Sequence, residues 1–269
     1  ADLFASVELA ANYYSSWMGA FWKAFPGGAD LEITGAINAA IGAMAEGAEL
    51  LKAAGYRNAS RATVAGIIGC ESEWDPQARN PGCETCEPLL DKDAAAEWPA
   101  LRAHWDAQHT SRAGGMTQFM GGTWSDMNEN QPKCSLAKYT KTHGITAKAD
   151  VLALRFDVRL AVLMGVEYAL YDTMTDTTYA AAVKRYFGVA NLGDLSSLDL
   201  LHAVYYAHHE GPGDAPRVLG LLRDGLESEE RYGSNFSRNW INNVPKGGKK
   251  TPTWTERLLA VGLKVEHFS

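Results

Sequence analysis

Glu71 is the residue whose type and setting most directly suggest chemistry. The apolar run at residues 64–69 leads into it, and Pro76 follows shortly afterwards. Apolar residues before an acid and a helix-ending proline after it predict a helix whose last turn carries Glu71. A carboxyl group backed by Ile67 and Ile68 would be partly desolvated, which favours the protonated form that a general acid needs. A surface glutamate at a helix end is the alternative interpretation.

Helical patterns position this acid and account for most of the chain. Its helix is predicted to begin near Arg61 with Ser60 as the N-cap, and the period-two alternation typical of strands is scarce. Residues 80–110 are predicted to be an irregular insertion with one short helix. The other predicted helices cover residues 3–25, 33–54 (ended by Gly55), 149–171, 178–187, 197–209, 215–226 and 255–263. The chain is therefore predicted to be all-α.

Composition and charge argue against several classes of function. The 269 residues carry 25 Lys+Arg against 32 Asp+Glu, a formal net charge of -7. Nucleic-acid binding depends on dense basic patches, so no nucleic-acid partner is expected. No apolar run reaches the roughly 18 residues of a transmembrane helix. Because the chain starts at Ala1 and not at Met, we expect an exported protein that has lost a signal peptide, with a start inside a longer chain as the alternative.

The four cysteines are relevant to the cellular compartment in which the protein works: Cys70, Cys83, Cys86 and Cys134. Cys83 and Cys86 form a C-x-x-C pair in a turn-rich stretch that follows Glu71 in the sequence. Disulfides are the favoured state, with three possible pairings if all four are oxidised, and they would agree with export. Free thiols are one alternative. A structural zinc ion is another, although the second C-x-x-C pair typical of such sites is missing.

The two ends of the chain are predicted to be extensions of a central domain. Residues 1–58 would form an N-terminal helical extension, in which Glu8 and Lys23 are the only charges of the helix at 3–25. This helix lacks the basic face of a membrane-surface helix, so docking on the protein's own domain is expected, and a surface for a protein partner is the alternative. Residues 227–269 would form a C-terminal extension packed on the domain.

Three motifs occur in an order that resembles the soluble lytic transglycosylase family, whose fold is that of goose-type lysozyme. The family's Glu-Ser followed by Asn/Asp-Pro is matched at residues 71–76, and its Gly-Leu-Met-Gln is matched at residues 115–118. Its Ala-Tyr-Asn-Ala-Gly-Pro-Gly is matched at residues 204–213, with three additional residues before the Gly-Pro-Gly. Residues 155–168 are similar to the helix between the last two motifs.

The resemblance implies a lysozyme-like domain over residues 59–226, with 80–110 as an inserted loop. It also implies cleavage of the β-1,4 bond between N-acetylmuramic acid and N-acetylglucosamine in peptidoglycan glycan strands, leaving a 1,6-anhydro end and using no cofactor or metal. Glu71 would be the single acid/base, because the sugar's own C6 hydroxyl replaces the second carboxylate of ordinary glycosidases. The implied substrate-binding residues are Ser72, Gly115, Met116, Gln118, Phe119, Tyr205, Tyr206 and His208.

Within this set, the resemblance implies particular roles. Ser72 and Gln118 would hydrogen-bond the sugar or hold the acid. The missing side chain of Gly115 would let the backbone approach the sugar closely. Tyr205, at the family's tyrosine position, would hydrogen-bond near Glu71 and help to set its protonation.

Departures from the family pattern leave two other functions open. Glu73 stands where the family has a small residue, and a second carboxylate that positions a water would make the protein a hydrolytic muramidase. Tyr206 replaces the family's Asn, and His208 and His209 have no family counterpart; they could bind substrate, or a metal together with Glu210, although a structural role is more usual. The third possibility is a non-catalytic glycan-binding, secretion or phage-tail module. In each case we expect a periplasmic or extracellular location, by export or by delivery from a phage or secretion system.

Overall fold

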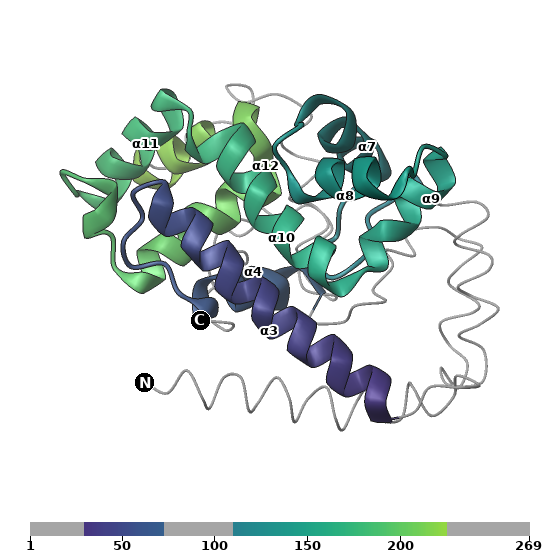
Figure 1. The fold of residues 1–269 in the computed structure, drawn as a ribbon. Helices are drawn as coiled ribbons and strands as arrows, with labels where there is room; N and C mark the ends of the chain where they lie inside the picture. Colours follow the sequence, from purple (N-terminus) through teal and green to yellow (C-terminus); the bar gives the residue numbers. More distant parts are fainter. Residues whose placement is uncertain (1–29, 73–109, 225–269) are drawn as a thin grey trace, which may run out of the picture. The chain divides into compact units, whose positions relative to one another are not determined.

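The computed structural model describes residues 30–72 and 110–224, and every regular element in these two ranges is a helix. The α-helices are α3 (Asp30–Ala53), α4 (Arg61–Ser72), α7 (Gly121–Asn130), α8 (Ser135–His143), α9 (Lys148–Ala153), α10 (Val158–Tyr168), α11 (Thr177–Phe187) and α12 (Ser197–Asp224) (Figure 1). Two 3-10 segments, η2 (Leu154–Phe156) and η4 (Leu192–Asp194), and a π-helix, η3 (Ala169–Met174), complete them. The all-α prediction is confirmed for this part of the chain. The predicted helices at 3–25 and 255–263 and nearly all of the 80–110 insertion lie outside it.

The chain divides into two compact units, which are described separately. The first comprises residues 1–46 and 71–165, and the second comprises residues 47–70 and 166–269. Helices α3, α4 and α10 contribute residues to both units. The boundary expected near residue 58 stays a prediction. In the described ranges, no helix combines the length and hydropathy that crossing a membrane requires.

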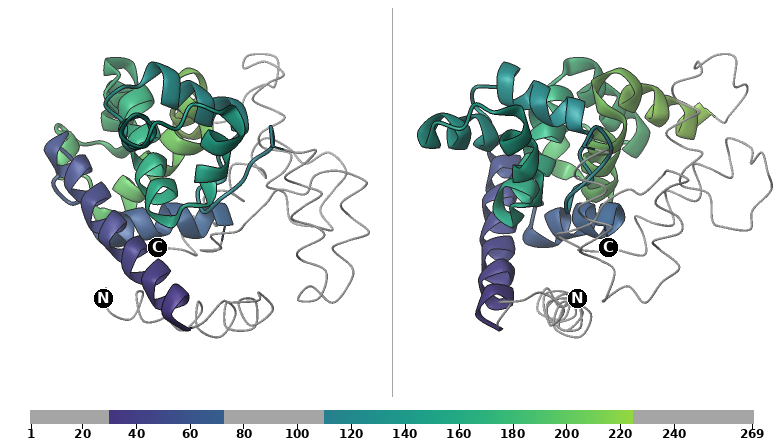
Figure 2. Two further views of the ribbon diagram at one scale, coloured as in Figure 1. Left: turned by 45° about the vertical axis from the view of Figure 1, so that its right-hand side comes forward. Right: turned by 90° about the vertical axis from the view of Figure 1, so that its right-hand side faces the viewer.

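Helix α3 is an unbroken helix in both views of Figure 2, and its end follows the sequence prediction. Gly55 has φ 100, a left-handed conformation that glycine adopts without steric cost. The amide of Tyr56 then donates to the carbonyl of Leu51 at 3.1 Å, which satisfies one of the last carbonyls of the helix. At the start of α4, Ser60 was the predicted N-cap. Here the amide of Ser60 donates to Thr63 Oγ1 at 3.1 Å, so the side-chain bond runs in the opposite direction to the one expected.

The first unit is organised around α7 and the residues that follow it. Helix α7 contacts α8 and α9, and these three helices lie together in Figure 1. Trp124 on α7 is fully buried, its Nε1 donates to Val151 O at 2.8 Å, and its ring packs edge-on against Phe119 with 5.2 Å between centroids. A buried indole needs such a partner for its N–H. Trp124 therefore joins α7 to α9 by packing and by one hydrogen bond.

The second unit is built on α12, which contacts η3 and α11. Two tyrosine hydroxyls bond main-chain carbonyls inside it. Tyr56 Oη donates to Met174 O at 3.2 Å, and Tyr179 Oη donates to Ala203 O. Burial raises the pKa of both tyrosines well above the ordinary value, so both hydroxyls remain protonated donors at neutral pH. These bonds tie the segment after α3 and the first turn of α11 to the core.

Small residues let the helices of the second unit approach closely. A Cβ placed on Gly66 of α4 would stand 2.7 Å from Leu201 Cδ2 of α12. A Cβ on Gly47 of α3 would stand 3.0 Å from Val166 of α10 and 3.4 Å from Val64 of α4. The packing of α4 on α12 therefore depends on the missing side chain of Gly66.

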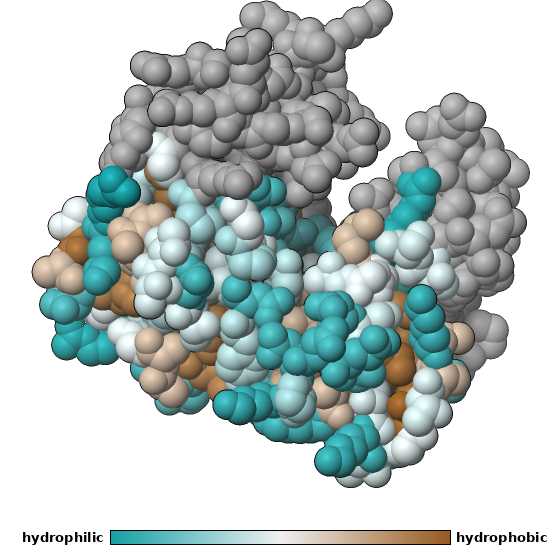
Figure 3. All heavy atoms as spheres, turned by 90° about the horizontal axis from the view of Figure 1, so that it is seen from above, coloured by the Kyte–Doolittle hydropathy of each residue, from teal (hydrophilic) through white to brown (hydrophobic). Residues whose placement is uncertain are grey.

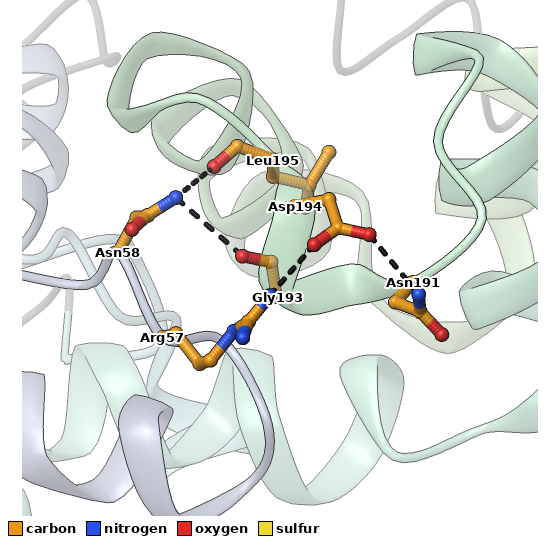
Figure 4. A network of polar contacts seen from close by, with 6 residues as sticks. All are labelled: Arg57, Asn58, Asn191, Gly193, Asp194 and Leu195. Atoms are coloured by element: carbon orange, nitrogen blue, oxygen red, sulfur yellow. Dashed lines mark hydrogen bonds and ion pairs between the residues drawn. The ribbon is translucent and has the colours of Figure 1, made fainter.

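The loop before α4 is joined to the loop before α12 by the polar network of Figure 4. Asn58 Nδ2 donates to Leu195 O at 2.6 Å and approaches Gly193 O at 3.5 Å. Arg57 pairs with Asp194 at 2.6 Å, and Asn191 Nδ2 donates to the other oxygen of that carboxylate at 3.0 Å. The Arg57–Asp194 pair is largely exposed, so solvent screening makes its contribution to stability small. The bonds from Asn58 to main-chain carbonyls are the part of the network that fixes the two loops.

One predicted helix is interrupted in the structure, and one predicted break is confirmed. The continuous helix predicted over 149–171 is interrupted at Asp157, whose backbone is extended (φ -73, ψ 117) and whose Oδ1 accepts from Leu160 N at 2.8 Å. A side chain that caps a new helix in this way competes with continuation of the old one. The predicted break between 209 and 215 is confirmed at Gly211, whose non-helical backbone (φ 68, ψ -175) divides α12 into two helical parts across a kink. Residues with a side chain rarely adopt a φ of 68, so the kink favours glycine.

The visible face in Figure 3 is mainly hydrophilic over the described residues, with apolar residues in small separate groups. Among the residues whose exposure the structure describes, the exposed large apolar side chains are Met120, 52% exposed, and Leu198, 41% exposed. Isolated apolar side chains of this kind are ordinary on protein surfaces.

Gly66→Val is expected to lower the free energy of unfolding by about 1–3 kcal/mol, because it inserts atoms into the closed contact with Leu201. Gly42→Ala on α3 is the control. Gly42 is exposed with nothing within 4 Å of a Cβ, so the change is expected to stabilise the helix by roughly 0.5–1 kcal/mol. Urea denaturation measures both. Equal effects of the two substitutions would contradict the close approach of α4 and α12.

Asp176 caps α11 and makes a pH-dependent contribution to stability. Hydrogen bonds from the amides of Tyr179 and Thr178 lower its pKa below the ordinary value. Because the folded-state pKa is the lower one, the contribution is complete above the unfolded-state pKa and is lost as pH falls through the folded-state pKa. Asp176→Ala is therefore expected to be less stable than wild type near pH 7, with a difference that shrinks as pH falls from about 5 to about 2. Urea denaturation across this range, with Asp150→Ala as an exposed first-turn control on α9, measures it. A stability difference between wild type and Asp176→Ala that stays constant with pH would show that the charge of Asp176 does not contribute to capping α11.

Candidate functional site

Glu71 and Ser72 form the last turn of α4, as predicted, and both are half-buried. Ile67 and Ile68, one turn earlier on the helix, are 1% and 0% exposed, so the acid follows a fully apolar turn. The Oε1 atom of Glu71 is itself buried and accepts no hydrogen bond from the described residues. A buried carboxyl oxygen without a donor is costly and uncommon in a native structure, which makes this atom a candidate to meet a ligand.

The second motif forms a tight turn in the first unit. Its arms are joined by the bond from Gly114 N to Phe119 O at 3.1 Å, and Gln118 N donates to Gly115 O at 3.1 Å. Gln118 has φ 49, the one positive φ of a non-glycine residue in the described ranges. Its Nε2 also donates to Gly115 O at 2.8 Å. A strained backbone of this kind persists only where the surroundings hold it, and such positions concentrate at functional sites.

Gly115 is required by the fold of this turn. It has φ 80, and a Cβ there would lie 2.0 Å from the carbonyl oxygen of Arg155. The space that a side chain would fill is therefore taken by the protein's own main chain. The predicted approach of a sugar to Gly115 would have to come from another direction.

The remaining members of the turn differ in exposure. Met116 and Phe119 are 0% and 3% exposed, so they anchor the turn in the core, whereas Gln118 is half-buried. Thr117 Oγ1 donates to Ala161 O at 2.9 Å and ties the turn to α10. The predicted contacts of Met116 and Phe119 with substrate stay predictions, and the half-buried Gln118 is the member best placed to meet a ligand.

The third motif lies on α12 in the second unit, and its aromatic residues are buried. Tyr205, Tyr206 and His208 are 0%, 3% and 7% exposed. The ring of Tyr205 lies 5.6 Å from that of His209, and the ring of His208 packs edge-on against Tyr168 at 5.9 Å. These contacts give the three predicted residues a packing role, and their contacts with substrate stay predictions.

His209 and Glu210 form a close pair at the kink of α12. His209 Nδ1 lies 2.5 Å from Glu210 Oε1, and the side chain of Glu210 is fully buried. A metal site at this point would need a third ligand. In the two described ranges, no group of three His, Cys, Asp or Glu side chains could hold a metal ion.

The cysteines differ from the favoured prediction. Cys70 and Cys134 are both buried and carry thiols and not a disulfide. The Cys134 sulfur caps α8 by accepting from Ala137 N at 3.3 Å. A framework of two disulfides that uses all four cysteines is therefore wrong, whereas the zinc alternative stays a prediction. Cys83 and Cys86 lie outside the described residues, as does Glu73.

Sequence reasoning missed one residue that shapes the candidate site. Arg155 is 1% exposed, and its guanidinium bonds the segment that contains the second motif. The sequence places Arg155 only in the segment at 155–168 that is similar to a helix of the family. The available signal was a cation next to the apolar pattern at 151–154, which indicates either a surface position or a satisfied buried charge.

Comparisons with protein-family models, with curated proteins and with solved structures found no match to this chain. The functional argument therefore depends on the residues and on their geometry.

Gly115→Ala is expected to destabilise the protein by about 3 kcal/mol or more, because it combines a positive φ with a backbone clash. Gly144→Ala is the matched control, with φ 65 and nothing within 4 Å of a Cβ, and is expected to cost about 1–2 kcal/mol. Urea denaturation measures both. If the two costs were equal, the contact between Gly115 and Arg155 O would be excluded.

Proposed function

We propose that this protein is a peptidoglycan lytic transglycosylase with Glu71 as its single acid/base. The observation that carries the proposal is the buried, unbonded Oε1 of Glu71 at the end of α4. An oxygen in that state has a hydrogen-bonding position open for the atom that a general acid serves. The order of the three motifs supports the same activity and a lysozyme-like arrangement of the helices.

The proposed reaction uses one carboxyl group twice. Glu71 donates its proton to the glycosidic oxygen between N-acetylmuramic acid and N-acetylglucosamine as the bond to the anomeric carbon breaks. The C6 hydroxyl of the muramic acid residue attacks that carbon, and the Glu71 carboxylate accepts the hydroxyl proton. The products are a free N-acetylglucosamine 4-hydroxyl and a 1,6-anhydro-muramic acid end, so Glu71 is regenerated and no water is consumed.

An intramolecular nucleophile explains why one acid suffices. Ordinary glycosidases need a second carboxylate to act as a nucleophile or to activate a water. Here the nucleophile belongs to the substrate and is already close to the anomeric carbon, which removes much of the entropic barrier. The remaining work for the protein is to hold the glycan strand in one orientation, which we assign to Ser72 and Gln118.

The substrate determines where the protein acts. Peptidoglycan lies outside the cytoplasmic membrane, so the protein would work in the periplasm or outside the cell, after export or after delivery by a phage or secretion system. No metal or cofactor enters any step of the proposed reaction.

Digestion of purified peptidoglycan followed by mass spectrometry tests the proposal. Anhydro ends are lighter than hydrolytic ends by one water, about 18 Da, because the C6 hydroxyl takes the place of water. We expect anhydro products. Products with the mass of hydrolytic ends would indicate a muramidase, and binding without products would indicate a non-catalytic glycan-binding module; either result would overturn the proposal.

Glu71→Gln is expected to lower kcat about 10²–10⁴-fold or more while glycan binding survives, because the amide keeps the shape of the side chain and cannot transfer the proton. Glu49→Gln makes the same substitution on α3, where Glu49 is exposed and pairs with Lys52, and is expected to keep wild-type activity. Near wild-type cleavage by Glu71→Gln would show that another residue is the acid.

A further inference from the structure

Arg155 is a charged side chain held inside the first unit. It lies in η2 and is 1% exposed. Its Nε donates to Leu152 O at 3.1 Å, and its Nη atoms donate to Arg112 O at 2.7 Å, Phe119 O at 3.0 Å and Thr110 O at 2.9 Å. A buried charge is tolerated only when it is well hydrogen-bonded, and these main-chain carbonyls supply that compensation.

The three Nη bonds reach both arms of the turn that carries Gln118. Thr110 and Arg112 precede the turn, whereas Phe119 closes it, and Phe119 O also accepts from Gly114 N. The main chain of residue 155 supports the turn as well, because its carbonyl oxygen occupies the space beside Gly115. Arg155 therefore holds the turn in two ways. Its guanidinium bonds both arms, and its carbonyl oxygen occupies the space beside Gly115.

An arginine is suited to this task for a geometric reason. Its planar guanidinium presents five N–H donors in a fixed fork, so one group can bond several carbonyls at once. A lysine offers a single nitrogen on a flexible stem and cannot reach three separated carbonyls together. Replacing Arg155 with lysine would therefore leave at least one of these carbonyls without its hydrogen-bond donor.

Gln118 is the side chain whose position the bonds from Arg155 to the turn would fix. Its Nε2 is engaged with Gly115 O at 2.8 Å, which fixes the plane of the amide. The opposite atom of the amide, Oε1, is an acceptor and suits a donor such as a sugar hydroxyl or the N–H of an N-acetyl group. Its placement depends on the positive φ of Gln118, and so on whatever keeps the turn closed.

We propose that Arg155 is a positioning residue for glycan binding: it fixes the turn at 110–119 so that the Gln118 amide meets the sugar in one orientation. The inference rests on the proposed function. Arg155 makes no contact with the reacting atoms in this scheme, so its loss would weaken binding more than it slows proton transfer.

The first test is a double-mutant cycle on soluble glycan strands, with Arg155→Lys, Gln118→Ala and the double variant. Each variant is assayed at a temperature at which its circular dichroism shows it folded. We expect each single substitution to raise KM about tenfold, with kcat within about twofold of wild type. The double variant should be no worse than the poorer single variant by more than about twofold, because Arg155 acts through the turn that presents Gln118.

Arg159→Lys is the matched control, because Arg159 is half-exposed and pairs with Glu46 on α3. It should keep the wild-type KM within about twofold, as expected for an exposed ion pair. Arg155→Gln is measured alongside, so that a folded variant is available if lysine is not tolerated. An unchanged KM in folded Arg155 variants, or KM effects that multiply in the double variant, would overturn the proposal.

Amide hydrogen exchange supplies a readout that does not depend on activity. Faster exchange in Arg155→Lys should be confined to residues 110–121, and an equal increase in both units would mark a general loss of stability and overturn a positioning role. The two proposals fail differently. Wild-type protein that neither binds nor cleaves glycan overturns the proposed function, whereas active wild type with an unaffected Arg155→Lys overturns only the role of Arg155.

Discussion

The guanidinium of Arg155, buried among main-chain carbonyls, constrains the geometry of the first unit. Removing a cation from water is costly, and the cost is offset only if the N–H groups find acceptors with good geometry. The acceptors used here belong to the segment at 110–119 and to Leu152, so the ion can be buried only if that segment closes around it. The strained φ of Gln118 and the glycine requirement at 115 both lie within this closed segment.

The second unit depends on close helix packing and on buried hydroxyls. Gly66 lets α4 approach Leu201 of α12, while Tyr56 and Tyr179 place their hydroxyls on carbonyls of η3 and α12. Gly66 lies five residues before Glu71 on the same helix. The aromatic residues of the third motif are part of the same buried core. Their most evident contribution is to the packing of α12.

The sequence predicted the helices well where periodicity and capping agree. Gly55 ends α3, and the apolar run before Glu71 becomes the buried turn of α4. Prediction failed where a local polar contact decided between two conformations. Asp157 interrupts an apolar pattern by capping α10, whereas the break expected at Gly211 is found there. Hydrophobic periodicity reports burial and not polar contacts of this kind, so it could not predict the interruption at Asp157.

The sequence by itself determined the all-α class of the described residues, the helix whose last turn carries Glu71, and the order of the motifs, because these depend on residue types and on short-range spacing. Only the tertiary structure decided that Arg155 holds the turn at 110–119, that Gly115 is required by a neighbouring carbonyl, and that Tyr205 and Tyr206 are buried. Each of these depends on contacts between residues distant in the chain. Burial and hydrogen bonding of that kind are set by how the helices pack, which local sequence patterns do not encode.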